Sequence, residues 1–288
     1  MGDELGSVHA HQEIRNRGKL DAVEFFGEDS NIVESASIQQ QRARTVERSV
    51  GNADIFLSRK IREEADRVGI EINAYTIGAN LFQPTPEAQA AEIERLKGQV
   101  EVAAILGART MRHDITWRTD VPWRQIIAET KDLVRELTEY AASKGVRTCT
   151  ENHGFVMQDA DRMEEMMLAV GHENYGWLVD MGNFLCADDP TVRAVAIAAP
   201  YAFHAHVKDF LVKPFDAVDP GDGWFKSRNG NYLRGTVAGH GVVPIAHALK
   251  VIKDSGYDGF VSYEFEGMED NIPALEAAYA FISRVLPK

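Results

Sequence analysis

The sequence contains few cysteines and no long apolar run. Its two cysteines, Cys149 and Cys186, stand in no CxxC or other metal-binding spacing, which argues against a disulfide scaffold and against a structural zinc site. The first residues, MGDELGSVHAHQEIRNRGK, lack the apolar core of a secretory signal, and no segment offers the roughly 18 consecutive apolar residues of a membrane span. We therefore expect a soluble, cytoplasmic protein that does not contact a membrane.

Basic residues are also in deficit. The chain carries 31 Lys and Arg against 44 Asp and Glu, and its formal net charge of −13 would repel a nucleic-acid backbone. With 44% hydrophobic and 26% charged residues, the composition is that of a globular protein with a large core. A length of 288 residues lies within the range of one α/β barrel. We predict a single domain over residues 1–288 with a small-molecule ligand.

Short apolar or β-branched runs alternate with amphipathic stretches, a pattern typical of βα units and of a parallel sheet. The predicted strands are Ala22–Phe26, Glu71–Ile77, Thr110–Asp114, Val146–Glu151, Gly176–Asp180, Phe203–Val207 and Phe260–Phe265. This order predicts an α/β fold, a (β/α)8 TIM barrel. Because such a barrel has eight strands and the residues before Leu20 contain no strand pattern, either the N-terminus is shortened or the first strand is missing or irregular, and we expect a shortened N-terminus.

The longest stretch without a predicted element runs from Phe210 to Gly239. It contains several turns rich in glycine or proline, together with Trp224, Phe225 and Tyr232. Irregular loops of this length inside a compact domain are usually functional. We interpret the stretch as a lid.

Four predicted strands end on a side chain that can bind a metal: Glu151, Asp180, His206 and Glu264. The carboxyl ends of all strands in a parallel barrel meet at one mouth, so ligands one βα unit apart in sequence become neighbours in space. The first three of these residues follow one another at about that spacing, and the long loop is added before the fourth. Three carboxylates and one imidazole suit a divalent cation such as Mn²⁺, Mg²⁺, Co²⁺ or Zn²⁺.

Each of the four could instead be an isolated polar residue at a strand end. For any single residue this alternative is as good as the metal site. For the whole set it is weaker, because several carboxylates crowded at one mouth repel one another without a cation. We therefore predict one divalent metal ion, with Mn²⁺ as the first expectation.

Several short motifs resemble the xylose isomerase-like barrel superfamily, in the group of sugar phosphate isomerases and epimerases. The resemblance runs from about Leu20 to the C-terminus and is carried by ENH at 151–153, VDMGN at 179–183, HVKD at 206–209, GHGVVP at 239–244, GYDG at 256–259 and YEFE at 263–266. It implies that Glu151, Asp180, His206 and Glu264 bind one metal ion. It also implies substrate contacts by His153, Asn183 and Lys208.

The resemblance further implies proton transfer next to a carbonyl. In that chemistry the metal polarises the carbonyl of a sugar and stabilises an enediolate. Glutamates that ligate the metal also remove and return the proton in related epimerases, which assigns the general acid and base to Glu151 and Glu264. Asn183 stands where ketose 3-epimerases carry a histidine, so the substrate is left open.

Several other side chains near the predicted mouth allow alternative roles. Glu266 lies on the same strand face as Glu264, and only the resemblance favours Glu264 as the ligand. His204 is expected to be a hydrogen-bonded residue one layer deeper. His113 could line the pocket and bind substrate, or pair with Asp114. His240 is expected to lie in a turn, and Lys208 could pair with its neighbour Asp209 instead of contacting a substrate.

The leading function is that of an isomerase or epimerase of a ketose or polyol-derived sugar in carbohydrate metabolism. The alternative is a metal-dependent lyase of the inosose, dehydroshikimate or 3-keto-glycoside type, because the same enediolate can expel a β-leaving group. Apurinic endonucleases share the barrel, but the acidic charge and Asn183 in the place of a further histidine ligand argue against DNA. A homo-oligomer is expected from the resemblance.

Overall fold

The computed structural model of the chain describes residues 22–26 and 52–286. The chain divides into two compact units, Met1–Thr116 with Asp132–Thr148 and Trp117–Lys131 with Cys149–Lys288. Helix α5 (Trp123–Ser143) and strand β4 (Arg147–Glu151) each have residues in both units. The expectation of a single domain over residues 1–288 stays a prediction.

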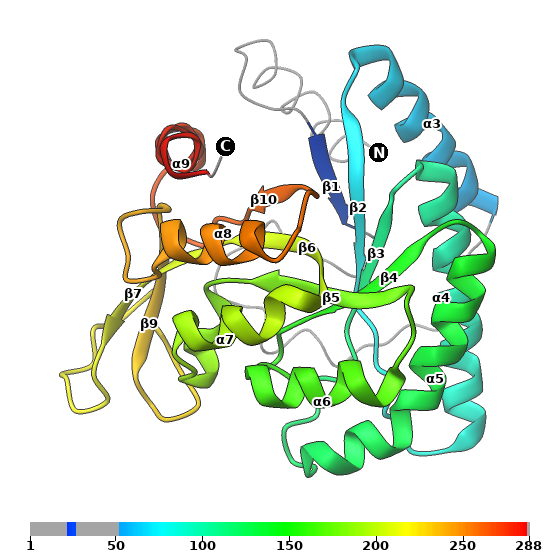
Figure 1. Cartoon of the computed structure of the whole chain (residues 1–288), viewed down its shortest axis with the longest axis horizontal. Helices are drawn as coiled ribbons and strands as arrows, with labels where there is room; N and C mark the ends of the chain where they lie inside the picture. Colours follow the sequence, from blue (N-terminus) through cyan, green and yellow to red (C-terminus); the bar gives the residue numbers. More distant parts are fainter. Residues whose placement is uncertain (1–21, 27–51, 287–288) are drawn as a thin grey trace. The chain divides into compact units, whose positions relative to one another are not determined.

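The first unit contains three parallel strands in the order β1 (Ala22–Phe26), β2 (Glu71–Ile77) and β3 (Thr110–His113). Two helices connect them, α3 (Asn52–Val68) and α4 (Pro86–Leu106), and these helices pack against each other and against β2 (Figure 1). Helix α4 begins where the Thr85 hydroxyl accepts a hydrogen bond from the Ala88 amide, and it ends at Gly107 with φ 71°. Sequence signals at both ends therefore set its length.

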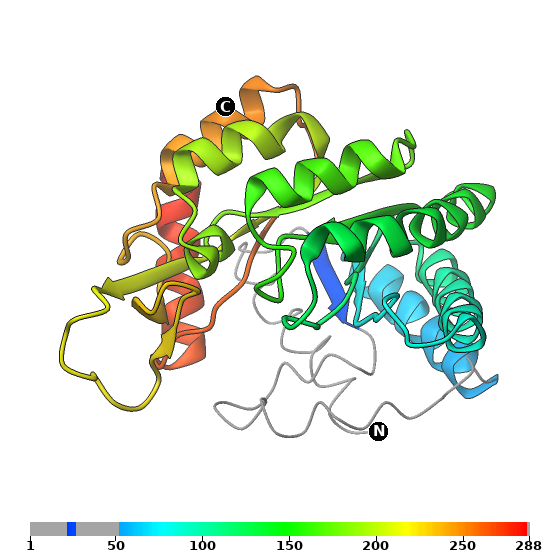
Figure 2. The same ribbon diagram turned by 90° about the horizontal axis from the view of Figure 1, so that it is seen from below.

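The second unit holds the parallel strands β5 (Tyr175–Asp180), β6 (Ala202–Val207) and β10 (Val261–Tyr263) in that order. Its helices are α6 (Ala160–Val170), α7 (Thr191–Ala198), α8 (Ile245–Asp254) and α9 (Asn271–Val285), with short 3-10 helices at Asn183–Ala187 and Ala199–Tyr201. Helices α6, α7 and α8 lie side by side and cover β5 and β6 (Figures 1 and 2). Every residue of β5 is buried, as expected of a covered parallel strand.

The seven predicted strands all appear among the described residues, as β1 to β6 and β10. Bounds agree within a few residues, and the largest difference is at β10, predicted as Phe260–Phe265 and observed as Val261–Tyr263. The prediction of an α/β barrel of parallel strands is confirmed by the order and direction of these strands in each unit. The expectation about a first strand before Leu20 lies outside the described residues.

The segment between β6 and α8 corrects one prediction, because it is not irregular. It forms an antiparallel sheet of β7 (Asp209–Lys213), β9 (Tyr232–Thr236) and β8 (Phe225–Lys226) (Figure 1). Phe210 and Leu233 pack against Cys186 in a small buried hydrophobic cluster, which supports the sheet. The turn-rich residues between β7 and β8 concealed the strands in the sequence. The role of a lid stays a prediction.

No helix in the described part of the chain is long and apolar enough to cross a bilayer.

Candidate metal centre

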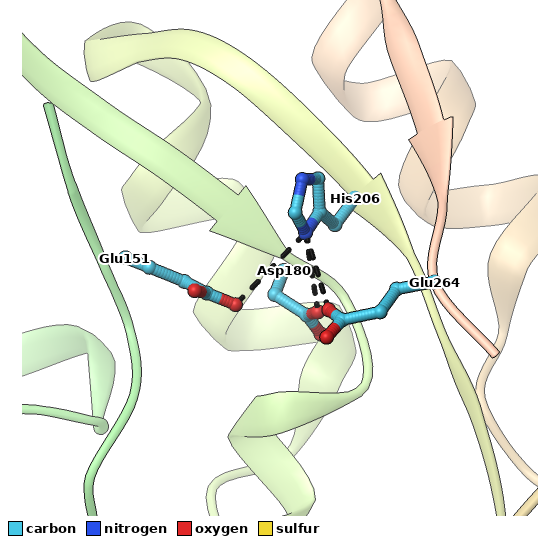
Figure 3. Close-up of side chains that lie close together, drawn as sticks. All are labelled: Glu151, Asp180, His206 and Glu264. Atoms are coloured by element: carbon cyan, nitrogen blue, oxygen red, sulfur yellow. Dashed lines mark hydrogen bonds and ion pairs between the residues drawn. The ribbon is translucent and has the colours of Figure 1, made fainter. Parts of the chain in front are cut away.

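The ends of neighbouring parallel strands in the second unit bring the four expected ligands together. Asp180 at the end of β5 is in register with His206 of β6. Glu264 directly follows β10, and its amide donates to the carbonyl of Val207, at 3.0 Å. Glu151 is the last residue of β4. Figure 3 shows the four side chains pointing toward a common centre.

One potential ligand atom from each of the four residues lies within 4.8 Å of all the others. The His206 Nδ1 atom is 3.3 Å from Glu264 Oε2, 3.9 Å from Asp180 Oδ2 and 4.0 Å from Glu151 Oε1 (Figure 3). Asp180 and His206 are buried, and the Glu264 side chain retains 21% of its exposure. The cluster is therefore a candidate site for one cation, with Glu264 as its most exposed member.

Asn152 fixes the strand end that carries Asp180. Its fully buried amide accepts hydrogen bonds from the Asp180 amide and from Trp177 Nε1, at 3.0 and 3.1 Å, and it donates to the Asp180 carbonyl at 2.9 Å. Asn152 follows Glu151 directly in the chain. One side chain thus ties the β4 ligand to the backbone of the β5 ligand.

The Asp180 carboxylate is oriented by the turn that follows it. Its Oδ1 atom accepts the amides of Gly182 and Asn183, both at 2.8 Å. Its Oδ2 atom is buried and accepts no hydrogen bond from the described residues. Burial, together with the nearby carboxylates of Glu151 and Glu264, raises the pKa of Asp180 to about 7. A buried carboxylate oxygen of this kind fits a cation, which would restore the interaction that water no longer supplies.

Asn183 connects Glu151 to Lys208. Its side-chain nitrogen donates to Glu151 Oε1 at 2.9 Å, and its oxygen accepts from Lys208 Nζ at 3.3 Å. Gln158 holds Asn183 in turn by donating to its carbonyl at 2.9 Å. Two of the expected substrate-binding residues, Asn183 and Lys208, therefore lie at the centre beside the ligands.

Lys208 lies among carboxylates although its side chain is 2% exposed. Its Nζ atom is 2.9 Å from Glu264 Oε2, 3.2 Å from Glu266 Oε1 and 3.5 Å from Asp180 Oδ2. Burial opposes the charged form, but Asp180, Glu264 and Glu266 outweigh it and hold the pKa of Lys208 well above its usual value. Burial likewise opposes ionisation of Glu264, but Lys208 and His206 hold its pKa well below the usual value. Both groups are therefore charged at neutral pH.

Asp209 has a separate task that the sequence analysis did not assign. Its carboxylate accepts four backbone amides, those of Phe210, Gly239, Gly241 and Val243, at 2.8 to 3.0 Å. A Cβ atom on Gly241 would lie 2.2 Å from Asp209 Oδ1, so only glycine fits there. Lys208 and Asp209 therefore do not pair with each other: Lys208 contacts the glutamates, and Asp209 binds backbone amides. The sequence offered one signal for this role: the glycines of GHG at 239–241, whose amides can approach the carboxylate at the end of HVKD closely.

The expected substrate-binding residue His153 is partly buried and makes an edge-to-face contact with Trp117, with ring centroids 4.8 Å apart. His113 belongs to the first unit, at the end of β3, where it is fully buried and its Nδ1 lies 3.0 Å from the Asp114 carbonyl oxygen. Burial lowers the pKa of His113. Their substrate contacts stay predictions.

The structure also places the side chains for which two readings were open. Glu264 belongs to the ligand cluster, whereas Glu266 is half exposed and contacts Lys208. His204 lies one layer below His206, with its Nε2 2.9 Å from the Ser262 hydroxyl. His240 is exposed in a turn closed by its amide and the Val237 carbonyl.

Fold and site together define an α/β barrel protein with a candidate divalent-metal centre at its strand ends. A family model described as xylose isomerase-like TIM barrel matches residues 13–285, and the chain belongs to this family. The expectation drawn from the sequence motifs is thereby confirmed. The family is one of enzymes, and isomerases or epimerases and dehydratases are among its relatives.

One curated relative is the inosose dehydratase of Yersinia enterocolitica, which is 26% identical over 158 residues. The match covers 51% of this chain and 49% of the relative, so the chain spans about half the length of the curated relative it matches. Among solved structures, the IOLI protein with a bound zinc atom has a TM-score of 0.71 at 16% identity, covering 96% of this chain and 92% of that one. An L-ribulose 3-epimerase has a TM-score of 0.70 at 15% identity, covering 98% and 89%. At these identities the structures establish the fold.

We predict that Asn152→Asp destabilises the protein. The substitution removes the donor to the Asp180 carbonyl and puts a carboxylate oxygen in its place, in a fully buried position. The expected loss is about 2 kcal/mol or more in the free energy of unfolding, measured by urea denaturation. Asn271→Asp, at an exposed position at the start of α9, is the matched control and should change little. Equal stability of the two variants would contradict the role given to Asn152.

Proposed function

We propose that the protein is a divalent-metal-dependent isomerase or epimerase of a ketose or polyol-derived sugar. The observation that carries the proposal is the cluster of Glu151, Asp180, His206 and Glu264, whose ligand atoms lie within 4.8 Å of one another. Membership of the xylose isomerase-like family supports a small sugar-like substrate. A cytoplasmic location, a homo-oligomer and a role in carbohydrate metabolism are part of the same proposal.

The donor set fits a divalent cation. The three carboxylates of the cluster carry more negative charge than the single Lys208 ammonium can compensate, and a divalent cation would compensate the excess. The buried Asp180 Oδ2 atom lacks a hydrogen-bond donor among the described residues. When bound, the cation would polarise the substrate carbonyl and offset the negative charge that develops on its oxygens. We expect Mn²⁺, with Mg²⁺, Co²⁺ and Zn²⁺ as further candidates; a zinc atom is named for the structurally similar IOLI protein.

Glu151 and Glu264 would move the proton. They extend from β4 and from the end of β10 and face each other across His206 (Figure 3). Asn183 donates to Glu151 Oε1 at 2.9 Å and so fixes the orientation of this carboxylate. Lys208 keeps Glu264 ionised, as a proton acceptor must be before it reacts. A substrate bound between the two glutamates could lose a proton to one of them and regain a proton from the other.

The other residues expected to contact the substrate would orient it. Lys208 offers a fixed ammonium, and His153 with Trp117 offers an aromatic surface at the end of β4. His113 is retained as a substrate-binding residue in this proposal. An ordered arrangement of this kind lowers the barrier mainly by holding the reacting carbon within reach of the carboxylates.

A lyase is the second candidate, favoured by the resemblance to the inosose dehydratase of Yersinia enterocolitica. The first step would be the same removal of a proton next to a carbonyl. The paths separate afterwards, when the enediolate either regains a proton or expels a β-hydroxyl group. The two functions therefore share the whole candidate centre and differ in their products.

The metal centre predicts that treatment with a chelator abolishes turnover in a panel of ketoses, inososes and 3-keto-glycosides, and that added Mn²⁺ restores it. Asp180→Asn should weaken metal affinity by at least about 100-fold, because it removes one charged ligand. Metal content and competition with a chelating dye measure this. Asp258→Asn, at an exposed position, is the matched control. Full activity of metal-free protein would refute the metal centre.

The proton-transfer pair predicts that Glu151→Gln lowers the turnover rate by about 10² to 10⁴-fold without unfolding the protein. In D₂O, an isomerase or epimerase should give a product of unchanged composition that carries deuterium at the carbon next to the carbonyl. A lyase should give an enone and release water. Mass spectrometry separates these outcomes, and deuterium-free product with unchanged composition would exclude both routes.

A further inference from the structure

Lys208 shares two oxygens with the candidate metal site. Its ammonium lies 2.9 Å from Glu264 Oε2 and 3.5 Å from Asp180 Oδ2. The same two atoms face His206 Nδ1 at 3.3 and 3.9 Å. A divalent cation bound by the cluster would draw on carboxylates that already neutralise a lysine. Two cations competing for the same carboxylates repel each other, and burial strengthens this repulsion.

The ammonium also has two partners outside the ligand cluster. Glu266 Oε1 lies at 3.2 Å and Asn183 Oδ1 at 3.3 Å from Lys208 Nζ. Lys208 is two residues beyond His206 in the sequence, and Glu266 is two residues beyond Glu264; Lys208 lies just past the end of β6, and both glutamates lie just past the end of β10. Glu266 can therefore hold the ammonium without engaging a ligand.

We propose that Lys208 is an internal competitor of the divalent cation, and that Glu266 is the positioning residue that draws its ammonium away from the ligand oxygens. Lys208 keeps the cluster compensated when no metal is bound, and it weakens the binding of any metal that enters. Glu266 limits this competition. The inference rests on the proposed metal centre and concerns the affinity that the chain gives to it.

The test is the affinity of the chelator-treated protein for Mn²⁺ and Zn²⁺, measured without substrate by competition with a chelating dye. Lys208→Met should bind each metal about tenfold more tightly or better, because a buried positive charge is removed. Glu266→Gln should bind about threefold more weakly or worse. In the Lys208→Met background the same Glu266→Gln change should alter affinity by less than about twofold, because the residue then has no lysine to position.

Thermal unfolding gives a second readout. Metal-free Lys208→Met should unfold at a lower temperature than the metal-free wild type, and Mn²⁺ should raise its Tm by a larger amount. Lys250→Met is the matched control, because Lys250 pairs with Asp254 on the surface of α8. Glu173→Gln, at an exposed position, is the control for Glu266→Gln. Neither control should change metal affinity.

The outcomes separate this inference from the proposal on which it rests. Wild-type protein that binds no divalent cation overturns the metal centre and the inference together. Wild-type protein that binds metal while Lys208→Met binds it equally or more weakly overturns the inference alone. An equal effect of Glu266→Gln in both backgrounds overturns the positioning role. If Lys208→Met does not fold, Lys208→Gln takes its place, and unweakened binding by Glu266→Gln still rejects the proposal.

Discussion

Repulsion among three carboxylates at the ends of adjacent strands is the constraint on which the candidate centre depends. Glu151, Asp180 and Glu264 approach one another around a single imidazole in a largely buried position. Carboxylates in such a place are stable only if nearby groups compensate their charge. The contacts described here provide that compensation in several ways. Two backbone amides donate to one oxygen of Asp180, and the side-chain amide of Asn183 donates to Glu151. The ammonium of Lys208 pairs with Glu264.

The parallel register creates this repulsion and also makes the site possible. The pairing of Asp180 with His206 places a carboxylate beside an imidazole at the same height in the sheet. Because one residue of slip would turn either side chain to the other face, the register must be firmly held. Asn152 bonds both the amide and the carbonyl of Asp180, and Asp209 accepts three amide hydrogen bonds from the loop that follows β9. Asn152 and Asp209, which are not candidate ligands, therefore hold the backbone near the candidate ligands in place.

The sequence made the strands and the four ligands predictable for one physical reason. Strand periodicity locates the strand ends, and a parallel sheet brings these ends together, so Glu151, Asp180 and His206 could be placed without coordinates. Glu264 and Glu266 could not be separated by alternation, because residues two apart would share one face of an extended strand. Which of the two reaches the cluster depends on where β10 ends and on the position of Lys208, both of which are tertiary facts.

The features that the sequence did not reveal depend on contacts between distant segments. The antiparallel sheet of β7, β8 and β9 relies on Phe210 meeting Leu233 and Cys186, and its connecting turns resemble those of an irregular loop. Asp209 looked like a partner of Lys208 because the two are adjacent. Neighbouring residues of an extended chain point to opposite sides, so they were poorly placed to pair, and Asp209 turns instead to the backbone of the loop at Gly239–Val243.

The arrangement around Asn183 bears on which side chains could transfer a proton at this centre. Both polar atoms of this amide are already engaged, one by Glu151 and the other by Lys208. An amide does not titrate, so it cannot exchange a proton with a substrate as a histidine at the same position could. In the proposed reaction the carboxylates of Glu151 and Glu264 would therefore move the proton, whichever product is released. The proposed isomerase and lyase routes would then differ in whether the substrate carries, on its β-carbon, a group that can leave.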